Sequence, residues 1–363
     1  MVNFKPTDEQ ELIRETMAAF ARDVLRPQAH EADERCEVPE NVVQRAWELG
    51  LVQSAIPEAL GGYGDPRSPI TGTLLLEELA YGDLALTLHL LAPRLLTIPL
   101  LLFGTEDQRK RWLPRFTGDR YAVGTAAFVE PRWDFDASSV STRAERVEGD
   151  YVVTGRKCLV PLARQAEALL VYATAPDGLA AFIVEPGTSG LVIGEREKNM
   201  GTRALETYPV GLEGVRLPAG SRLGGEGADL EPLVNASRVA TAALAVGVSR
   251  AAFEYGVAYA KERRAFGVAI AQKQAIAFML ATMATEIDAM RLLAWEAAWR
   301  LERGQPATRE SCLARDYASK AALKITDDAV QVLGGHGYIR DHPVEQWLRD
   351  ARGFTTFDGL AIV

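Results

Sequence analysis

The fold is decided by a stretch near the start of the last third, Tyr259-Ala260-Lys261-Glu262-Arg263-Arg264-Ala265-Phe266-Gly267. It connects two long segments of helical pattern, from about residue 235 to 264 and from about 272 to 302. A third such segment runs from about 308 to 333 and stops at Gly334-Gly335, since glycine commonly ends a helix. Long helices joined by short connections predict an antiparallel bundle.

Upstream of the bundle, from about Tyr121 to Gly224-Gly225, short β-branched runs alternate with turn residues. Their regular spacing predicts a small antiparallel sheet or barrel. The expected strands are 151–153, 169–172, 181–184, 191–193 and 208–212.

The first third has the apolar spacing of helices. Thr7 and Gln10 have the spacing of a capping box, and apolar residues follow at helical intervals until Pro27, where we expect the first helix to end. The predicted organisation is therefore mainly α with a central β domain: an N-terminal helical domain (1–120), a middle β-barrel or sandwich (121–228) and a C-terminal four-helix bundle (229–363).

The composition is that of a soluble globular protein. The chain has 363 residues and a net charge of −9, so an acidic surface makes nucleic acid an unfavourable partner. The most apolar run, 95–103, is about half the length of a membrane-spanning helix. The first residues lack the apolar core of a signal peptide, and three widely spaced cysteines suggest buried reduced thiols. We expect a cytoplasmic protein with no membrane partner.

The residues alone identify little chemistry. Neither the four histidines nor the three cysteines have metal-ligand spacing, and there is no nucleophile elbow. The glycine-rich turn at 334–337 has two interpretations, a phosphate-cradling turn or a helix C-cap.

Several segments in collinear order resemble the acyl-CoA dehydrogenase family. The stretch quoted above, followed by Gln274, resembles that family's YA.ER..FG…Q signature, and residues 331–340 resemble QVLGG.GY.R. Residues 349–352 match RDAR, and 104–114 resemble a GTEEQK..YLP helix. The resemblance covers nearly the whole chain. It implies the three-domain fold above, an FAD cofactor, an acyl-CoA substrate and assembly as a homodimer or homotetramer.

By this resemblance, one half of the FAD site lies on the bundle and is donated across a subunit interface. Arg263 would pair with the pyrophosphate, because a guanidinium suits a diphosphate. Phe266 would pack on the cofactor. The adenosine side would be lined by Gln274, Gln331, Gly334 and Gly335.

The other half, on the middle domain, departs from the family pattern. The resemblance places Phe128, Val129, Leu159 and Val160 at the cofactor. Val129 stands for a threonine that hydrogen-bonds the flavin ring, and Leu159 for the tryptophan that shields it. Pro161 stands for another threonine and has no N–H. Several polar contacts to the flavin ring are thus replaced by apolar side chains.

The substrate face departs as well. Phe135 stands where the family has a serine that contacts acyl-CoA, and with Trp133 it is expected to narrow the ligand channel. Arg238 matches an arginine that borders the acyl-CoA site, or it forms an interhelical ion pair. Asp358 stands where the family's catalytic glutamate is, one methylene shorter, and it is the candidate base. It could equally be a turn aspartate.

Three hypotheses follow, the first of them with a variant. The first is an FAD-dependent oxidoreductase that abstracts the α-proton of an acyl thioester and transfers the β-hydride to flavin. A variant of it is oxidation of another carbon acid, as in nitroalkane-oxidase-like relatives. The second is a catalytically degenerate partner subunit that donates an ADP half-site in a hetero-oligomer with a homologue, or that binds no flavin. The last is a CoA-thioester binding protein without redox activity.

Overall fold

The computed structural model describes residues 5–363; residues 1–4, which begin the predicted N-terminal domain, lie outside the described residues. The first third is helical, as predicted. Its helices are α1 (Asp8–Phe20), α2 (Arg26–Arg35), α3 (Glu40–Glu48), α4 (Pro69–Gly82), α5 (Leu84–Leu91), α6 (Arg94–Phe103) and α7 (Glu106–Trp112).

The first helix does not end at Pro27. The Thr7 and Gln10 capping box is present, but α1 continues through a π-helical segment, η1 (Ala21–Leu25), into α2. Pro27 lies in the first turn of α2, where a missing N–H costs little. The prediction of a stop was wrong because the wider π turn restarts the helix just before the proline.

The middle of the chain forms a seven-stranded sheet. Its strands are β1 (Val123–Ala127), β2 (Arg143–Val147), β3 (Asp150–Pro161), β4 (Ala166–Ala175), β5 (Gly178–Val184), β6 (Leu191–Ile193) and β7 (Thr207–Leu217). Each predicted strand is present within β3 to β7. The sheet is mixed rather than antiparallel, because β1 pairs with β4 in parallel. Strand β2 also pairs with β4 in parallel, through the single residue pair Arg143 and Thr174.

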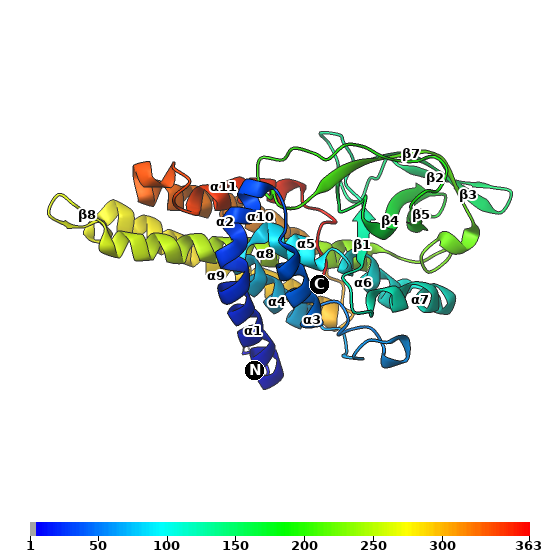
Figure 1. The fold of residues 1–363 in the computed structure, drawn as a ribbon, viewed down its shortest axis with the longest axis horizontal. Coiled ribbons are helices and arrows are strands. Elements are labelled where there is room, and N and C mark those ends of the chain that lie inside the picture. The colour runs from blue at the N-terminus through cyan, green and yellow to red at the C-terminus, as the bar shows by residue number, and fades with distance from the viewer. Residues whose placement is uncertain (1–4) are drawn as a thin grey trace.

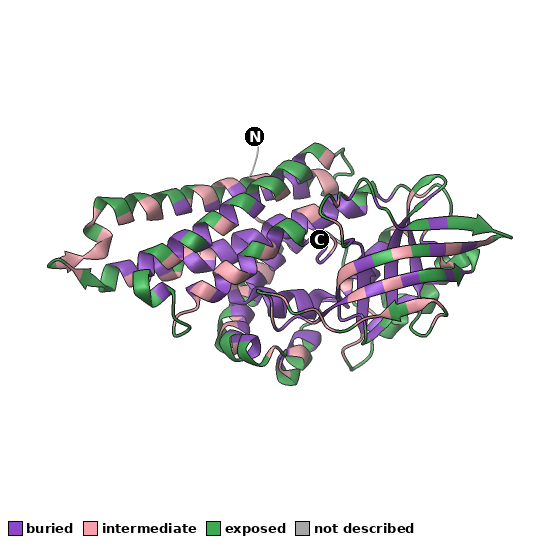
Figure 2. Cartoon of the chain, turned by 90° about the horizontal axis from the view of Figure 1, so that it is seen from above, coloured by how far each residue is buried: buried purple, intermediate pink, exposed green. Residues whose placement is uncertain are grey.

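The last third is the predicted bundle. It contains α8 (Glu231–Glu262), α9 (Gln274–Glu302), α10 (Thr308–Leu333) and the short α11 (Val344–Ala351). A two-stranded hairpin, β8 (Arg264–Ala265) and β9 (Val268–Ala269), joins α8 to α9. Most residues along the first two-thirds of α8 are buried, so α8 is the central helix of the molecule (Figure 2).

The N-terminal helix α4 packs against the bundle. Gly247 of α8 permits the approach, since a Cβ there would lie 2.3 Å from the carbonyl oxygen of Glu77. The buried carboxylate of Glu77 is neutralised by Arg250 at 3.1 Å and Arg291 at 2.6 Å. A buried carboxylate requires such partners, so these ion pairs fix the contact between the first and last thirds.

The sheet and the β8–β9 hairpin lie at opposite ends of the longest axis, with the helices between them (Figure 1). We propose the three-domain division 1–120, 121–228 and 229–363. Within the described residues, no single helix has the length and apolarity to cross a membrane. The bent helix pair Leu84–Leu91 and Arg94–Phe103 is long and apolar enough when its two helices are taken together, by length and composition only.

Candidate functional site

A cleft of about 510 Å³ lies between the middle of the chain and the bundle. It brings together five of the residues predicted from the sequence: Val129, Phe135, Leu159, Arg238 and Asp358. These residues come from the loop after β1, from β3, from α8 and from the segment after α11. The tertiary fold therefore places the candidate base, the candidate substrate residues and part of the candidate flavin face on one cavity.

Asp358 forms an ion pair at the wall of this cleft. Its Oδ2 accepts a hydrogen bond from Nη2 of Arg315 on α10 at 2.9 Å, and the same Nη2 donates to the Thr355 carbonyl at 2.9 Å. The Asp358 side chain is 15 % exposed. Burial raises the pKa of Asp358, while Arg315 and Arg238 oppose that rise. The result is a partly desolvated carboxylate with access to the cleft, which is a suitable arrangement for a proton acceptor.

Local backbone geometry sets the position of Asp358. A 3-10 segment, η7 (Arg352–Thr356), follows α11 and brings the chain back toward α10. Gly359 then turns the chain with a φ of +77°, a conformation open to glycine. Its N–H donates to Ser237 Oγ on α8 at 2.9 Å. Asp358 is thus held between α10 on one side and α8 on the other.

Arg238 also faces the cleft. Its Nη1 donates to Asn235 Oδ1, one turn earlier on α8, at 3.2 Å. No carboxylate lies within ion-pair distance of its guanidinium among residues 5–363, so the interhelical ion pair considered above does not form in the described structure. Arg238 is available to an anionic or carbonyl-bearing ligand.

A buried ion pair supports the cleft from behind. Lys157 Nζ, on a side chain that is 0 % exposed, lies 3.1 Å from Glu130 Oε1 and 3.0 Å from the Phe128 carbonyl oxygen. Burial would raise the pKa of Glu130, but Lys157 and the N–H groups of Thr142 and Ser141 lower it to about 2. Burial lowers the pKa of Lys157 to about 8, against the attraction of Glu130. The pair fixes the loop after β1 to β3.

A smaller cavity of about 150 Å³ adjoins the cleft, because Leu159 and Thr356 line both. Leu159 adopts a left-handed φ of +54°, and its N–H donates to the Glu197 carboxylate at 3.0 Å. Asp350 also lines this cavity, and its Oδ2 is buried and has no hydrogen-bond partner. An orphaned buried oxygen of this kind favours an additional ligand or water in the cavity. The flavin ring that the resemblance places next to Leu159 stays a prediction.

The predicted half-site on the bundle lies elsewhere. Arg263, Phe266, Gln274, Gln331, Gly334 and Gly335 are all exposed. Phe266 is 94 % exposed at the β8–β9 hairpin, at the end of the molecule far from the sheet (Figure 1). The guanidinium of Arg263 has no hydrogen-bond or ion-pair partner anywhere in the described residues. Exposed glycines and an unpaired guanidinium fit a diphosphate ligand.

Gly334 caps α10 with a φ of +58°, and the 3-10 turn η6 (Gly334–Gly337) follows. The C-cap interpretation of this turn is therefore correct, while its role as a phosphate cradle stays a prediction. Phe128 and Val160 are 4 % and 0 % exposed, so neither residue lies open to the cleft in the described structure, and their contact with a cofactor stays a prediction.

Arg315 was not predicted from the sequence, because it belongs to none of the family motifs. Its register on α10 could have indicated it, since Cys312 and Asp316 share the same face and also line the cleft. Cys312 is exposed and Cys36 and Cys158 are half-buried, so the expectation of three buried thiols was wrong. Trp133 is 99 % exposed at the cleft wall and leaves the channel open, against the predicted narrowing.

Comparison with known proteins identifies the class. Sequence models of the acyl-CoA dehydrogenase N-terminal, middle and C-terminal domains match residues 7–119, 125–215 and 228–361. The chain belongs to the acyl-CoA dehydrogenase family, whose members are FAD-dependent oxidoreductases.

Individual relatives agree with this assignment. The chain is 36% identical to the probable acyl-CoA dehydrogenase YngJ of Bacillus subtilis, over 97% of this chain and 94% of the relative. It is 34% identical to the bovine mitochondrial short-chain specific acyl-CoA dehydrogenase, over 98% and 87%. Among solved structures, butyryl-CoA dehydrogenase from Megasphaera elsdenii superimposes with a TM-score of 0.88 at 30% identity, covering 99% of this chain and 96% of that one.

Proposed function

We propose that this chain is an FAD-dependent acyl-thioester dehydrogenase with Asp358 as its base. The observation that carries the proposal is the position of Asp358. Its carboxylate is 15 % exposed and lies on a cleft that is also lined by Arg238 and by the apolar side chain of Leu159. Bound FAD would accept the hydride that leaves the β-carbon. Asp358 takes the proton from the α-carbon, and the electron pair of that C–H bond forms the new Cα–Cβ double bond.

Arg315 and Arg238 have complementary parts in this scheme. Arg315 orients the Asp358 carboxylate through the 2.9 Å ion pair. Arg238, free of carboxylate partners, is suited to the phosphate or carbonyl groups of acyl-CoA. Leu159 and Asp350 line the smaller cavity, where we expect the flavin ring.

The proposal includes an oligomer. Within one chain the β8–β9 hairpin, which follows Arg263, and the sheet, whose strand β3 contributes Leu159 to the cleft, lie at opposite ends of the longest axis (Figure 1). A complete FAD site therefore needs the bundle tip of a second chain. We propose a homodimer or homotetramer in the cytoplasm, with Arg263, Phe266, Gln274, Gln331 and the two glycines completing the partner's cofactor site.

A second candidate is the catalytically degenerate partner subunit. It is favoured by the loss of polar groups at the flavin-ring face: Val129, Leu159 and Pro161 offer no side-chain donor, and the Leu159 N–H is already used by Glu197. Oxidation of another carbon acid, such as a nitroalkane, would use the same aspartate. A CoA-thioester binding protein without redox chemistry is compatible with the open cleft.

Flavin content and reduction separate these candidates. The purified protein is expected to show the visible absorbance of oxidised flavin, with one FAD per chain, and to lose that absorbance on addition of acyl-CoA. A colourless protein that takes up no added FAD would overturn the proposal. Flavin bound only after co-expression with a homologue would instead favour the partner subunit, and reduction only by nitroalkanes would favour the other carbon acid.

Asp358→Asn tests the base. Asparagine keeps the size and removes the proton acceptor, so flavin reduction should slow by about 10²–10⁴-fold while FAD stays bound. Asp316→Asn is the matched control, because Asp316 lines the same cleft on α10. Equal rates in the Asp358→Asn variant and the unmodified protein would show that the base is another group.

A further inference from the structure

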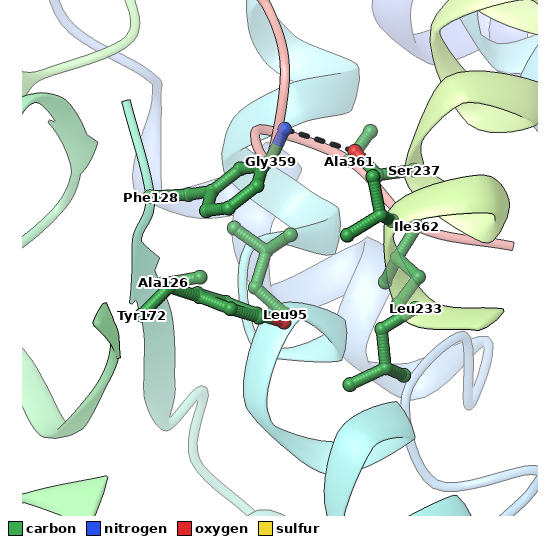
Figure 3. Close-up of a pocket in the computed structure, with 10 residues that line it drawn as sticks. Leu95, Ala126, Phe128, Tyr172, Leu233, Ser237, Gly359, Ala361 and Ile362 are labelled. Atoms are coloured by element: carbon green, nitrogen blue, oxygen red, sulfur yellow. Dashed lines mark hydrogen bonds between the residues drawn. The ribbon is translucent and has the colours of Figure 1, made fainter. Parts of the chain in front are cut away.

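The last four residues of the chain pack into the apolar interior behind Asp358. After the turn at Gly359, the chain runs inward as Leu360–Val363, which we call the inward segment. All four of its residues are buried, with Val363 at 0 % exposed. Figure 3 shows Ala361 and Ile362 beside Ser237 and Leu233 of α8, with the hydrogen bond from Gly359 to Ser237 above them. The inward segment thus fills the interior that a carbon chain extending past Asp358 would enter.

An aromatic wall closes the same space from the side of the sheet. Phe135, on the cleft, meets Phe128 edge-to-face with ring centroids 5.7 Å apart. Phe128 in turn packs on Tyr172 at 4.7 Å. A Cβ added at Gly359 would lie 2.7 Å from the Cβ of Phe128, so the backbone and the aromatic ring are already in contact. These aromatic side chains therefore limit how far a carbon chain can extend inward from the cleft.

The cavity that remains behind this wall is about 20 Å³. Leu95, Phe128, Tyr172, Leu233 and Ile362 are among the side chains that line it (Figure 3). A volume of this size accommodates about one water-sized or methyl-sized group. Protein interiors are close-packed, so each additional methylene would have to displace a side chain that already has its contacts.

The inward segment is also held at its far end. The Val363 carbonyl accepts a hydrogen bond from Nη2 of Arg67. Gly72 of α4 provides space for this residue, since a Cβ there would lie 3.2 Å from the Val363 Cβ. The segment is therefore fixed to both α8 and the N-terminal helices, and a ligand would not easily push it aside.

The cleft itself offers little to a long alkyl chain. Its walls carry the charged groups of Glu130, Asp136, Arg238, Arg315 and Asp358. An alkyl chain laid over these groups would desolvate them without replacing their hydrogen bonds. A long chain therefore has no apolar cavity of matching size behind Asp358, and in the cleft the apolar side chains are interspersed with these charged groups.

We infer that the acyl group of the substrate is short, with about four carbons or fewer, and that Phe128 and Ile362 set this limit. The α- and β-carbons lie in the cleft beside Asp358, and the one methyl-sized space behind Gly359 admits one further carbon. The CoA portion extends through the open mouth of the cleft. The inference rests on the proposed function, because it assigns a substrate class to the same site.

A chain-length series of saturated acyl-CoA thioesters from propionyl to octanoyl tests the limit, with kcat/KM for flavin reduction as the readout. From butyryl to octanoyl, kcat/KM should fall by about 10-fold or more, the range that a misfit of a few methylenes produces. Ile362→Ala enlarges the cavity and should raise the octanoyl-to-butyryl ratio by about 10-fold. Ile193→Ala, the same change on β6, is the matched control and should leave the ratio unchanged.

The outcomes are distinct. Equal kcat/KM for octanoyl-CoA and butyryl-CoA in the unmodified protein overturns the inference and leaves the proposed function standing. Reduction by none of the thioesters overturns the proposed function and this inference with it. Should Ile362→Ala fail to fold, Ile362→Val removes one methyl group and is expected to shift the preference toward pentanoyl-CoA. An unchanged preference in the folded variant refutes the role of Ile362.

Discussion

The cleft around Asp358 and the tip of the bundle around Arg263 are opposites in their electrostatics. At the cleft, the carboxylates of Asp358 and Glu130 have cationic partners within the chain, Arg315 and Lys157 respectively. At the tip, Arg263 is exposed and has no partner among the described residues. The cleft is thus pre-organised by its own chain, whereas the tip has contacts still to make. The two regions should therefore respond differently to substitution.

The largest effect on stability is expected at the buried Lys157–Glu130 ion pair behind the cleft. Lys157→Met leaves Glu130 as a buried carboxylate without its cation, which should lower the free energy of unfolding by about 3–5 kcal/mol. Urea unfolding measures it. The double variant Lys157→Met with Glu130→Gln removes the unpaired charge and should recover part of the loss. A loss below about 1 kcal/mol in the single variant would contradict the buried pairing.

Gly359→Ala should cost less. The new Cβ meets Phe128 at 2.7 Å, and the φ of +77° is strained for alanine, so the expected loss is about 1–3 kcal/mol. Thermal unfolding measures the change. Gly304→Ala separates the two causes, because Gly304 has a φ of +60° with nothing within 4 Å of the added Cβ. Equal losses in both variants would mean that contact with Phe128 has no role.

At the tip, substitution should affect the cofactor and spare the fold. Arg263→Gln removes a charge-assisted hydrogen bond to the diphosphate, a loss of about 1.5–3 kcal/mol and hence about 10–100-fold in FAD affinity. Fluorescence titration of the apoprotein with FAD measures the affinity, and the unfolding midpoint of the apoprotein should stay constant. Arg264→Gln, the neighbouring exposed arginine, is the control. A drop in apoprotein stability would show that Arg263 has a structural role instead.

The smallest effect is a shift in pH dependence. Asp358 acts as a base when deprotonated, so flavin reduction rises with pH through its pKa, which burial raises. Arg315 stabilises the carboxylate, and Arg315→Gln should raise that pKa further, moving the acidic limb of kcat/KM to higher pH by about one unit. Arg309→Gln, at an exposed position of α10, should leave the limb in place. A limb that moves to lower pH would contradict the ion pair.

Much of the fold was predictable from local pattern. The helices at 231–262, 274–302 and 308–333 follow from apolar periodicity and from glycine at their ends, and the strands from β-branched runs. Two features were not predictable in this way. The π-helical turn before Pro27 and the parallel pairing of β1 with β4 depend on packing against distant elements, which residue pattern does not encode.

The candidate site likewise has a part that was predictable from motifs and a part that depends on tertiary contacts. Asp358, Arg238 and Leu159 were predicted through motifs, and the structure brings them to one cleft. Arg315 was missed because its partner Asp358 lies 43 positions away along the chain. The size of the cavity behind Asp358 was equally invisible, because it depends on how Phe128, Ile362 and α8 meet.

The amino-acid sequence was sufficient to predict the family, the order of helices and strands, and the residue types suited to hold a diphosphate or remove a proton. These properties are local, since they reside in short motifs and in the period of apolar residues. The tertiary structure alone decided which charges are paired, which are free, and how much space lies behind Asp358. Those properties arise from contacts between distant segments, where close packing and desolvation set the outcome.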